Sequence, residues 1–328
     1  MQISVGTFNL NNLFSRYNFR ASVNSLRNAD PNGEDISVTY TFDNQSDFTL
    51  RTFQGRLIKG KEPAETAMIA ERILAMNVDV LAVQEVEDIS VLKQFNSIQL
   101  ANLYPHVVLV EGNDPRLIDV GLMSRYPIGA ITSFQTATHP SEPDKLIFGR
   151  DLLAVEILDQ TRRKKLFTLY NTHLKSHFVD YRSDPVEGKR NNDLRRQYQA
   201  EAIAGIISSR ERKGSRFVLT GDMNDPVTSA ALQPMLAIDG GQLINAVTDP
   251  VETRLPKPER QGSGPQTSAW SYRHNPPGAD TPPTYGLYDQ IWLSPGLAGK
   301  LVSSHIDRRT KHGGDGSDHD PVWVKLAL

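Results

Sequence analysis

Apolar residues in this chain gather in short runs with polar ends, which is the pattern of strands in a buried sheet. Residues 79–85 read Asp-Val-Leu-Ala-Val-Gln-Glu, a continuous apolar run typical of a strand covered on both faces. Residues 3–10 and 216–220 form similar runs, and each is followed at once by Asn, Gly or Asp residues. The pattern therefore predicts strands that end in side chains able to bind a ligand.

Between these runs, apolar residues recur at helical spacing. After Pro63, which a first helical turn tolerates, they stand at positions 67, 70, 73 and 74. Further elements are expected as helices over 89–103, 193–209 and 229–237, as strands near 107–110, 120–124, 128–134, 288–293 and 301–306, and as a hairpin of 146–158 with 167–172. This mixture of many strands and few helices indicates a two-sheet core with helices outside it.

Two long stretches lack such a pattern. Residues 16–61 are polar, contain one predicted hairpin, and are interpreted as an insertion at the rim of the functional face. Residues 249–284 are rich in proline, glycine and charge, with Trp270 and Tyr272 among them, so we expect a long loop there and not a linker. A length of 328 residues allows two domains, but one large domain fits as well, and we expect a single domain over 1–328.

Composition narrows the class of protein. The chain has no cysteine, which excludes disulfides, thiolate zinc sites and a cysteine nucleophile. The net charge is −2 at pH 7, so contact with nucleic acid would require a local basic patch. Neither a signal peptide nor a membrane span is recognisable, so we expect a cytoplasmic protein, or a secreted or periplasmic one if a leader has been removed. No membrane and no protein partner are indicated.

The polar residues at the strand ends suit a metal or phosphate site. Gly221 breaks the strand 216–220, so Asp222 and Asn224 can point the same way and offer hard oxygen donors to Mg²⁺, Mn²⁺ or Ca²⁺. An Asx-type turn would explain the same residues. Glu85 and His173 also end strands, where a solvated strand end and a structural histidine are the alternatives.

Six short motifs, taken together, resemble the endonuclease/exonuclease/phosphatase superfamily, whose fold is deoxyribonuclease I-like. They are Thr-Phe-Asn-Leu-Asn at 7–11, Val-Gln-Glu at 83–85, Asn-Thr-His-Leu at 171–174, Gly-Asp-Met-Asn at 221–224, Tyr-Asp-Gln-Ile at 288–291 and Ser-Asp-His-Asp-Pro-Val at 317–322. Each is weak by itself, but their order is specific and spans nearly the whole chain. The resemblance implies an α+β, four-layer αββα sandwich of two mixed, mainly antiparallel sheets with helices outside.

The same resemblance implies hydrolysis of phosphodiesters with a divalent metal ion, Mg²⁺ or Mn²⁺, or alternatively Ca²⁺. Asn11, Glu85 and Asp318 would surround one metal position. Asp222 and Asn224 would hold the attacking water or a second metal. A cation fits this chemistry because a phosphodiester is anionic and repels hydroxide, so the charge that develops must be neutralised.

Two histidines would carry the proton chemistry. The resemblance implies that His319, oriented by Asp289, contacts the scissile phosphate or acts as a base. An Asp–His pair fixes the imidazole tautomer and stabilises its charged form. His173 would stabilise the transition state or protonate the leaving oxygen, and Asp119 is our candidate to orient it.

Asn9 would lie near the substrate phosphate, and Arg150 resembles a family arginine that contacts it, although an ordinary salt bridge is the alternative for Arg150. Thr220 and Gln290 depart from the inositol-phosphatase signature and disfavour that branch. We therefore expect a weakly sequence-selective nuclease that also accepts small phosphodiesters. The alternatives are a small-molecule phosphodiesterase or phosphatase without a nuclease role and, less favoured, a catalytically inactive binding module.

A basic edge beside the site is also expected. Arg308, Arg309, Lys311 and His312 stand shortly before Asp318, so they would flank the position of a bound nucleic-acid phosphate.

Overall fold

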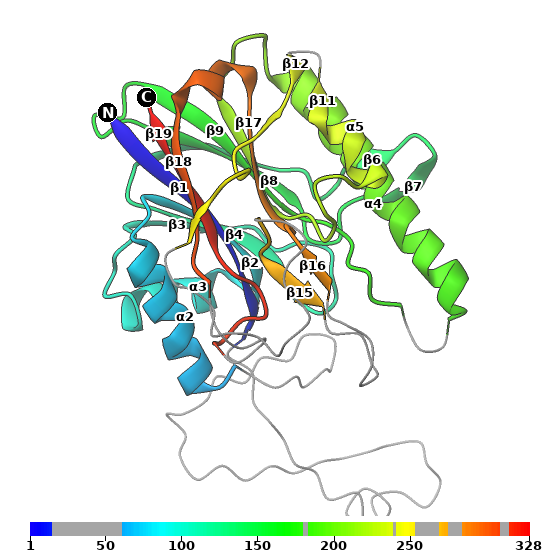
Figure 1. Ribbon diagram of the computed structural model, residues 1–328, viewed down its shortest axis with the longest axis horizontal. Coiled ribbons are helices and arrows are strands. Elements are labelled where there is room, and N and C mark those ends of the chain that lie inside the picture. Colours follow the sequence, from blue (N-terminus) through cyan, green and yellow to red (C-terminus); the bar gives the residue numbers. More distant parts are fainter. Residues whose placement is uncertain (15–60, 180–182, 239–240, 253–268, 275–283, 309–314) are drawn as a thin grey trace, which may run out of the picture.

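The computed structural model describes residues 1–14, 61–179, 183–238, 241–252, 269–274, 284–308 and 315–328, and Figure 1 shows their arrangement. The strands form two large sheets. The seven-stranded sheet has the order β14 (Val251–Glu252), β18 (Leu301–Ile306), β19 (Val322–Ala327), β1 (Gln2–Leu13), β2 (Val80–Val86), β4 (Asp119–Ser124) and β3 (His106–Leu109). The six-stranded sheet has the order β13 (Ile244–Asn245), β17 (Asp289–Leu293), β10 (Phe217–Asp222), β9 (Lys165–His173), β8 (Leu152–Leu158) and β5 (Ile128–Ser133).

Helices and short hairpins complete the described part. The α-helices are α2 (Pro63–Met76), α3 (Ile89–Ile98), α4 (Pro185–Arg210) and α5 (Gln233–Leu236), with 3-10 turns at Ala230–Leu232 and Pro295–Lys300. The short pairs are β6 (Thr138–His139) with β7 (Glu142–Leu146), β11 (Ala237–Ile238) with β12 (Gly241–Gln242), and β15 (Tyr272–His274) with β16 (Thr284–Gly286). Within these residues, no helix is long and apolar enough to cross a membrane.

Three apolar clusters define four layers. One lies between the two sheets, one joins the seven-stranded sheet to α2 and α3, and one joins the six-stranded sheet to α4 and α5. Strand β2 shows how the sequence produces this order, because its side chains alternate between faces. Val80 and Ala82 enter the cluster between the sheets, while Leu81 and Val83 pack under the helices. The predicted αββα sandwich of mixed, mainly antiparallel sheets is confirmed.

Element boundaries differ from the predictions where side chains decide them. Helix α3 ends at Ile98 and not near 103. Helix α4 begins at Pro185 and not at 193, because Asp184 caps it by accepting hydrogen bonds from the backbone N–H groups of Val186 and Glu187. The helix expected over 229–237 is a 3-10 turn followed by the single turn of α5. Nearly all of the predicted insertion 16–61 and much of the loop 249–284 lie outside the described residues, so the single domain stays a prediction.

Candidate functional site

The candidate residues lie at one edge of the sandwich because of the strand directions. Strands β1 and β2 are parallel and end at this edge, as do the parallel strands β9 and β10. Strands β4, β17 and β19 are antiparallel to these neighbours and therefore begin there. The residues that this topology brings to the edge are Asn9, Asn11, Glu85, Asp119, Arg150, His173, Asp222, Asn224, Asp289, Asp318 and His319.

The backbone at this edge is irregular in a way that redirects side chains. The pairing of β1 with β2 shifts register between Asn9 and Leu13, and that of β2 with β4 shifts between Val83 and Val86. Asn11 (φ 46°), Glu85 (φ 60°) and Asn224 (φ 52°) are all left-handed. Non-glycine residues rarely adopt this conformation, and such strain concentrates at functional sites.

Gly221 permits a close approach of β10 to β9 at this edge. Its φ is 134°, and a Cβ atom there would lie 1.9 Å from the carbonyl oxygen of Thr172 on β9. No L side chain fits in that space. The glycine therefore allows β10 to stay paired up to Asp222, which lies opposite His173 in the sheet.

Asp222 occupies the centre of the site. Its Oδ2 atom accepts a hydrogen bond from Asn9 Nδ2 at 2.9 Å and lies 3.5 Å from His173 Nε2 and 3.7 Å from His319 Nε2. Its Oδ1 atom accepts a hydrogen bond from the backbone N–H of Asn224 at 2.8 Å. The pKa of Asp222 is raised to about 7, chiefly by burial and further by the charge of Asp289, against the opposing charge of His319.

His319 is fixed by groups from three parts of the chain. Its Nδ1 atom donates to Oδ2 of the buried Asp289 at 2.7 Å, and its backbone N–H donates to Ser317 Oγ at 3.1 Å. The ring of Tyr272 packs against it at an angle of 37°, with a centroid distance of 4.8 Å. Burial acts to lower the pKa of His319, but the charges of Asp289 and Asp222 outweigh it and hold that pKa well above the usual value.

His173 and Asp119 come from different sheets, His173 at the end of β9 and Asp119 at the start of β4. Asn171, two residues before His173, donates to the carbonyl of Gly121, which is two residues after Asp119, at 2.8 Å. This bond joins β9 to β4, but Met123, which shares the alternation of Asp119 on β4, packs under the helices, whereas Val120 and Leu122 enter the cluster between the sheets. Both are buried, and neither His173 Nδ1 nor Asp119 Oδ2 has a hydrogen-bond partner among the described residues. No direct bond joins the two side chains, so the orienting role of Asp119 stays a prediction.

The pKa shifts of His173 and Asp119 each favour the neutral form of the side chain. Burial, followed by the positive charges of Arg150 and His319, holds the pKa of His173 well below its usual value. Burial raises the pKa of Asp119 to about 7, although the backbone N–H of Gly112 donates to its Oδ1 at 2.9 Å.

The predicted metal ligands offer oxygen atoms only. Glu85 accepts hydrogen bonds from Asn9 Nδ2 at 3.3 Å and from the backbone N–H of Asn12 at 3.0 Å, and burial together with the charge of Asp318 raises its pKa. Two mutually repelling carboxylates favour a bound cation. Among the described residues, no group of three or more His, Asp or Glu side chains could hold a metal alone. A cation here would therefore use Glu85 and Asp318 with amide oxygens and waters, as Mg²⁺ commonly does.

Lys61 is a neighbour of this group that the sequence did not single out. Its Nζ atom donates to the carbonyl of Asn11 at 2.6 Å. Burial lowers its pKa, while the charges of Glu65, Asp318 and Glu85 oppose that effect. The ammonium group therefore lies within electrostatic reach of both predicted metal-binding carboxylates.

Arg150 forms a salt bridge, which is the alternative to a phosphate contact that the sequence left open for this residue. Its Nε atom lies 3.4 Å from Asp114 Oδ2, and its Nη1 atom donates to the carbonyl of Leu174 at 3.3 Å. Arg150 is 3% exposed, yet its positive charge acts on Glu85, His173 and Asp222. It contributes positive potential to the site from within the protein.

The predicted basic edge is wrong for Arg308. This residue is fully buried, with its guanidinium 3.7 Å from the ring centroid of Trp270 and 3.6 Å from Asp320 Oδ2. It supports the loop of His319 and cannot face a groove. Arg309, Lys311 and His312 lie outside the described residues.

Arg72 of α2 supports the same loop and had no signal in the sequence beyond its place in a helix. It donates to Asp320 Oδ1 at 2.7 Å, to the carbonyl of Asp307 at 2.9 Å and to the carbonyl of His319 at 3.2 Å. A buried guanidinium with three such acceptors fixes the approach of the chain to the site.

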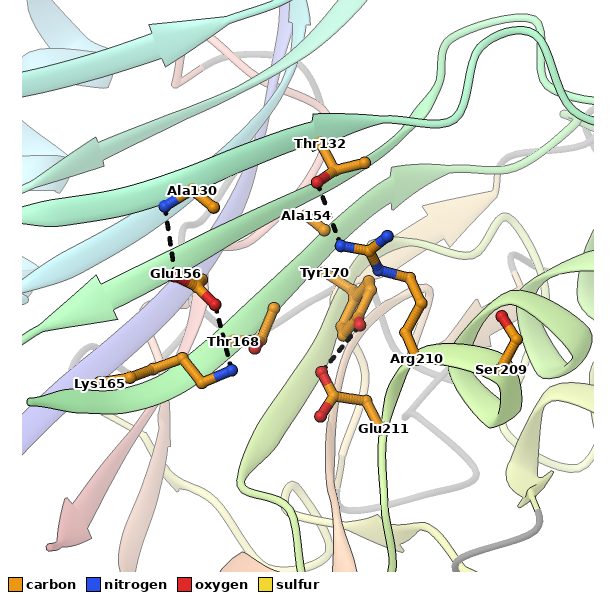
Figure 2. A pocket seen from close by; sticks show the side chains of 10 residues that line it. All are labelled: Ala130, Thr132, Ala154, Glu156, Lys165, Thr168, Tyr170, Ser209, Arg210 and Glu211. Atoms are coloured by element: carbon orange, nitrogen blue, oxygen red, sulfur yellow. Dashed lines mark hydrogen bonds and ion pairs between the residues drawn. The ribbon is translucent and has the colours of Figure 1, made fainter.

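A surface hollow elsewhere contains none of the candidate residues. It lies over β5, β8 and β9 and beside the end of α4 (Figure 2). Its charged groups satisfy one another or nearby hydroxyls: Lys165 pairs with Glu156 at 3.1 Å, Glu211 accepts from Tyr170, and Arg210 donates to Thr132. Each charged group of the hollow thus has a polar partner within the protein, and the two positive and two negative charges of its lining sum to zero.

The sequence profile of the Endonuclease/Exonuclease/phosphatase family matches residues 6–319, which include every candidate residue. No curated protein sequence matches the chain significantly.

Solved structures share the fold at low identity. An endonuclease/exonuclease/phosphatase from Bacteroides vulgatus is 16% identical, with a TM-score of 0.57 over 100% of this chain and 99% of that one. An AP endonuclease from Archaeoglobus fulgidus is 14% identical, with a TM-score of 0.56 over 99% of this chain and 100% of that one. A D. rerio TDP2 humanized by 14 mutations is 13% identical, with a TM-score of 0.55 over 100% and 99%. Such identities establish the fold alone.

Proposed function

Because the chain belongs to the endonuclease/exonuclease/phosphatase family, whose members hydrolyse phosphoester bonds, we propose that it cleaves phosphodiesters with the help of Mg²⁺ or Mn²⁺. The observation that carries the proposal is the position of Asp222. Its Oδ2 atom lies between the Nε2 atoms of His173 and His319, 3.5 and 3.7 Å away. One carboxylate between two imidazoles suits a reaction in which protons move around an anionic phosphate.

Asp222 is the proposed base that takes a proton from the attacking water. Its pKa of about 7 is near neutrality, where a general base is most effective. The backbone N–H of Asn224 and the Nδ2 group of Asn9 hold one carboxylate oxygen each, so the group cannot rotate away. Asn224 also anchors its amide by donating to the carbonyl of Leu174 at 3.1 Å.

His319 is the proposed donor to the scissile phosphate. Its bond to Asp289 directs Nε2 toward the centre of the site, and the two neighbouring carboxylates favour the imidazolium form. An imidazolium donates a charge-assisted hydrogen bond to a phosphate oxygen. The low pKa of His173 favours its neutral form, and its Nε2 atom lies 3.5 Å from Asp222 Oδ2, which suits a role in stabilising the charge of the transition state.

Glu85, Asp318 and Asn11 would hold the metal ion. The all-oxygen set and the electrostatic strain on Glu85 fit a hard divalent cation. When bound, the ion would neutralise charge that develops on the phosphate.

The proposed substrate is nucleic acid cleaved with little sequence preference, together with small activated diesters. The experiment that tests this proposal measures hydrolysis of plasmid DNA, single-stranded DNA, RNA, a bis-aryl phosphodiester and an aryl phosphomonoester. Each substrate is assayed with Mg²⁺, with Mn²⁺ and with excess EDTA. We expect cleavage of nucleic acid and of the small diester, and none in EDTA. Brisk hydrolysis of the small diester without cleavage of DNA or RNA would instead identify a small-molecule phosphodiesterase, and inactivity on all five would identify a binding module.

A further inference from the structure

A segment that follows β9 exposes two aromatic rings next to the site. Leu174 is buried, but the His177 side chain is 40% exposed and Phe178 is 67% exposed. A large exposed aromatic side chain is uncommon on a soluble protein, and its position beside a candidate site indicates contact with a ligand. We call residues His177 and Phe178 the ring pair.

The backbone of the ring pair is fixed. Asn192 of α4 donates from Nδ2 to the carbonyls of His177 at 3.4 Å and of Phe178 at 2.9 Å. Lys175 Nζ donates to the carbonyl of Phe178 at 3.3 Å. The two rings are therefore presented to solvent from a backbone that α4 holds in place, which lowers the entropic cost of binding.

The imidazole of His177 is held in one orientation. Arg196 can only donate, so Nδ1 of His177 accepts from it at 3.2 Å, and Nε2 lies 3.3 Å from Asp225 Oδ1. Both nitrogens therefore have partners within the protein. What it offers to a ligand is a flat ring.

A row of rings connects His177 with the site. The centroid of His177 lies 6.1 Å from that of Tyr288, Tyr288 stacks on Tyr272 at 5.0 Å, and Tyr272 lies 4.8 Å from His319. His177 is thus at the outer end of a row of rings whose inner end is the proposed phosphate donor, and the exposed Phe178 follows it in the chain. The inner rings face one another, so the free ring surface is at the outer end.

Resting on the proposed function, we propose that the ring pair binds unpaired nucleobases of the strand whose phosphate is cleaved. The substrate class is then single-stranded nucleic acid in preference to duplex, because paired bases cannot stack on a protein ring. Aromatic stacking tolerates any base, which agrees with weak sequence preference.

The test compares two strands with the same phosphates. One is a single-stranded oligodeoxynucleotide, and the other is an oligomer of the same length made of abasic tetrahydrofuran units. For the wild-type protein we expect a KM about tenfold lower for the strand that carries bases. His177→Asn, which removes the ring, should bring the ratio of the two KM values close to one, and His177→Phe, which keeps a ring, should restore it.

Phe178→Ser provides a second variant that does not disturb the bonds of His177, and Ile98→Ser on α3 is its matched control. Ile98 is 65% exposed and is not part of the site edge. We expect Phe178→Ser to lower the KM ratio and Ile98→Ser to leave it at the wild-type value. Thermal unfolding confirms that each variant folds.

Binding is measured separately from cleavage by the fluorescence of a single-stranded oligonucleotide containing 2-aminopurine, in EDTA. Stacking quenches this base, so the wild type should quench it and His177→Asn should not. Equal KM values for both strands in the wild type, or unquenched 2-aminopurine, would overturn the inference while leaving the proposed function intact. If neither strand is cleaved, the proposed function fails, and the inference, which depends on it, fails as well.

Discussion

Asp289 accepts the Nδ1 proton of His319 across 2.7 Å, and this bond decides which nitrogen of the imidazole faces the site. Both side chains are buried, and they come from strand β17 and from the loop before β19. Nε2 of His319 is thereby directed toward Asp222. The chemistry of the site depends on this orientation.

Removing either partner of that bond is expected to reduce kcat without unfolding the protein. His319→Ala should lower kcat by several orders of magnitude, and Asp289→Asn by about 10²-fold or more, because the amide no longer fixes the tautomer. His173→Ala should lower kcat by at least ~10²-fold. Steady-state kinetics with a small diester measure this, and loss of the thermal transition in a variant would indicate a structural role for that residue.

Metal dependence is expected to involve Glu85. Glu85→Gln keeps the shape of the side chain and removes one charge, so the Mg²⁺ concentration for half-maximal activity should rise about tenfold. Glu71→Gln, on the exposed face of α2, is the control and should behave as the wild type. A metal-induced rise in melting temperature provides a readout without substrate. Full activity in excess EDTA would contradict the predicted metal dependence.

Stability is expected to fall as pH rises through the pKa of Asp119. Its folded-state pKa is about 7 against an ordinary 3.8, so the folded protein retains a proton that the unfolded chain has released. This contribution to the free energy of unfolding is complete below pH 3.8 and is lost as pH approaches 7. Asp119→Asn should therefore be the more stable protein at pH 8, by at least ~1 kcal/mol. Urea unfolding from pH 5 to 8 measures it; parallel pH profiles for both proteins would refute the expectation.

Asp119 is also expected to act on the reaction through His173. Asp119→Asn should lower kcat by about tenfold in the wild-type background and have no further effect in the His173→Ala background. A merely structural role would produce the same loss in both backgrounds. The double-mutant cycle on kcat separates the two cases.

Arg308→Ala is expected to destabilise the protein and not to weaken binding of nucleic acid specifically. The change leaves Asp320 with one buried partner fewer and removes the contact with Trp270, so we expect a loss of about 3 kcal/mol. Arg190→Ala, at an exposed position of α4, should change stability by less than about 0.5 kcal/mol. Denaturant unfolding provides the comparison. A raised KM for DNA at unchanged stability would instead support the predicted contact of Arg308 with nucleic acid.

The polar ends of the strands were predictable because they depend on local order in the chain. A continuous apolar run such as 80–83 must be buried, and the residues that follow it must leave the sheet, so Glu85 was expected at a strand end without knowledge of its neighbours. The order of the six motifs identified the family for the same reason, since it is a property of the sequence alone.

Only the tertiary structure decided which of these residues are in contact and which charged side chains are buried. Asn9 joins Asp222, 213 residues away, and Arg72 joins His319, 247 residues away, through contacts that only the packing of two sheets and a helix creates. Arg308 looked like a surface cation, yet packing against Trp270 buries it. Lys61 carried no signal in the sequence, and Tyr272 stood out only as an aromatic residue of a long loop, because their importance lies in distances to Asn11 and His319. Sequence spacing fixes which face of an element a side chain occupies, but burial and partners depend on what packs against that face.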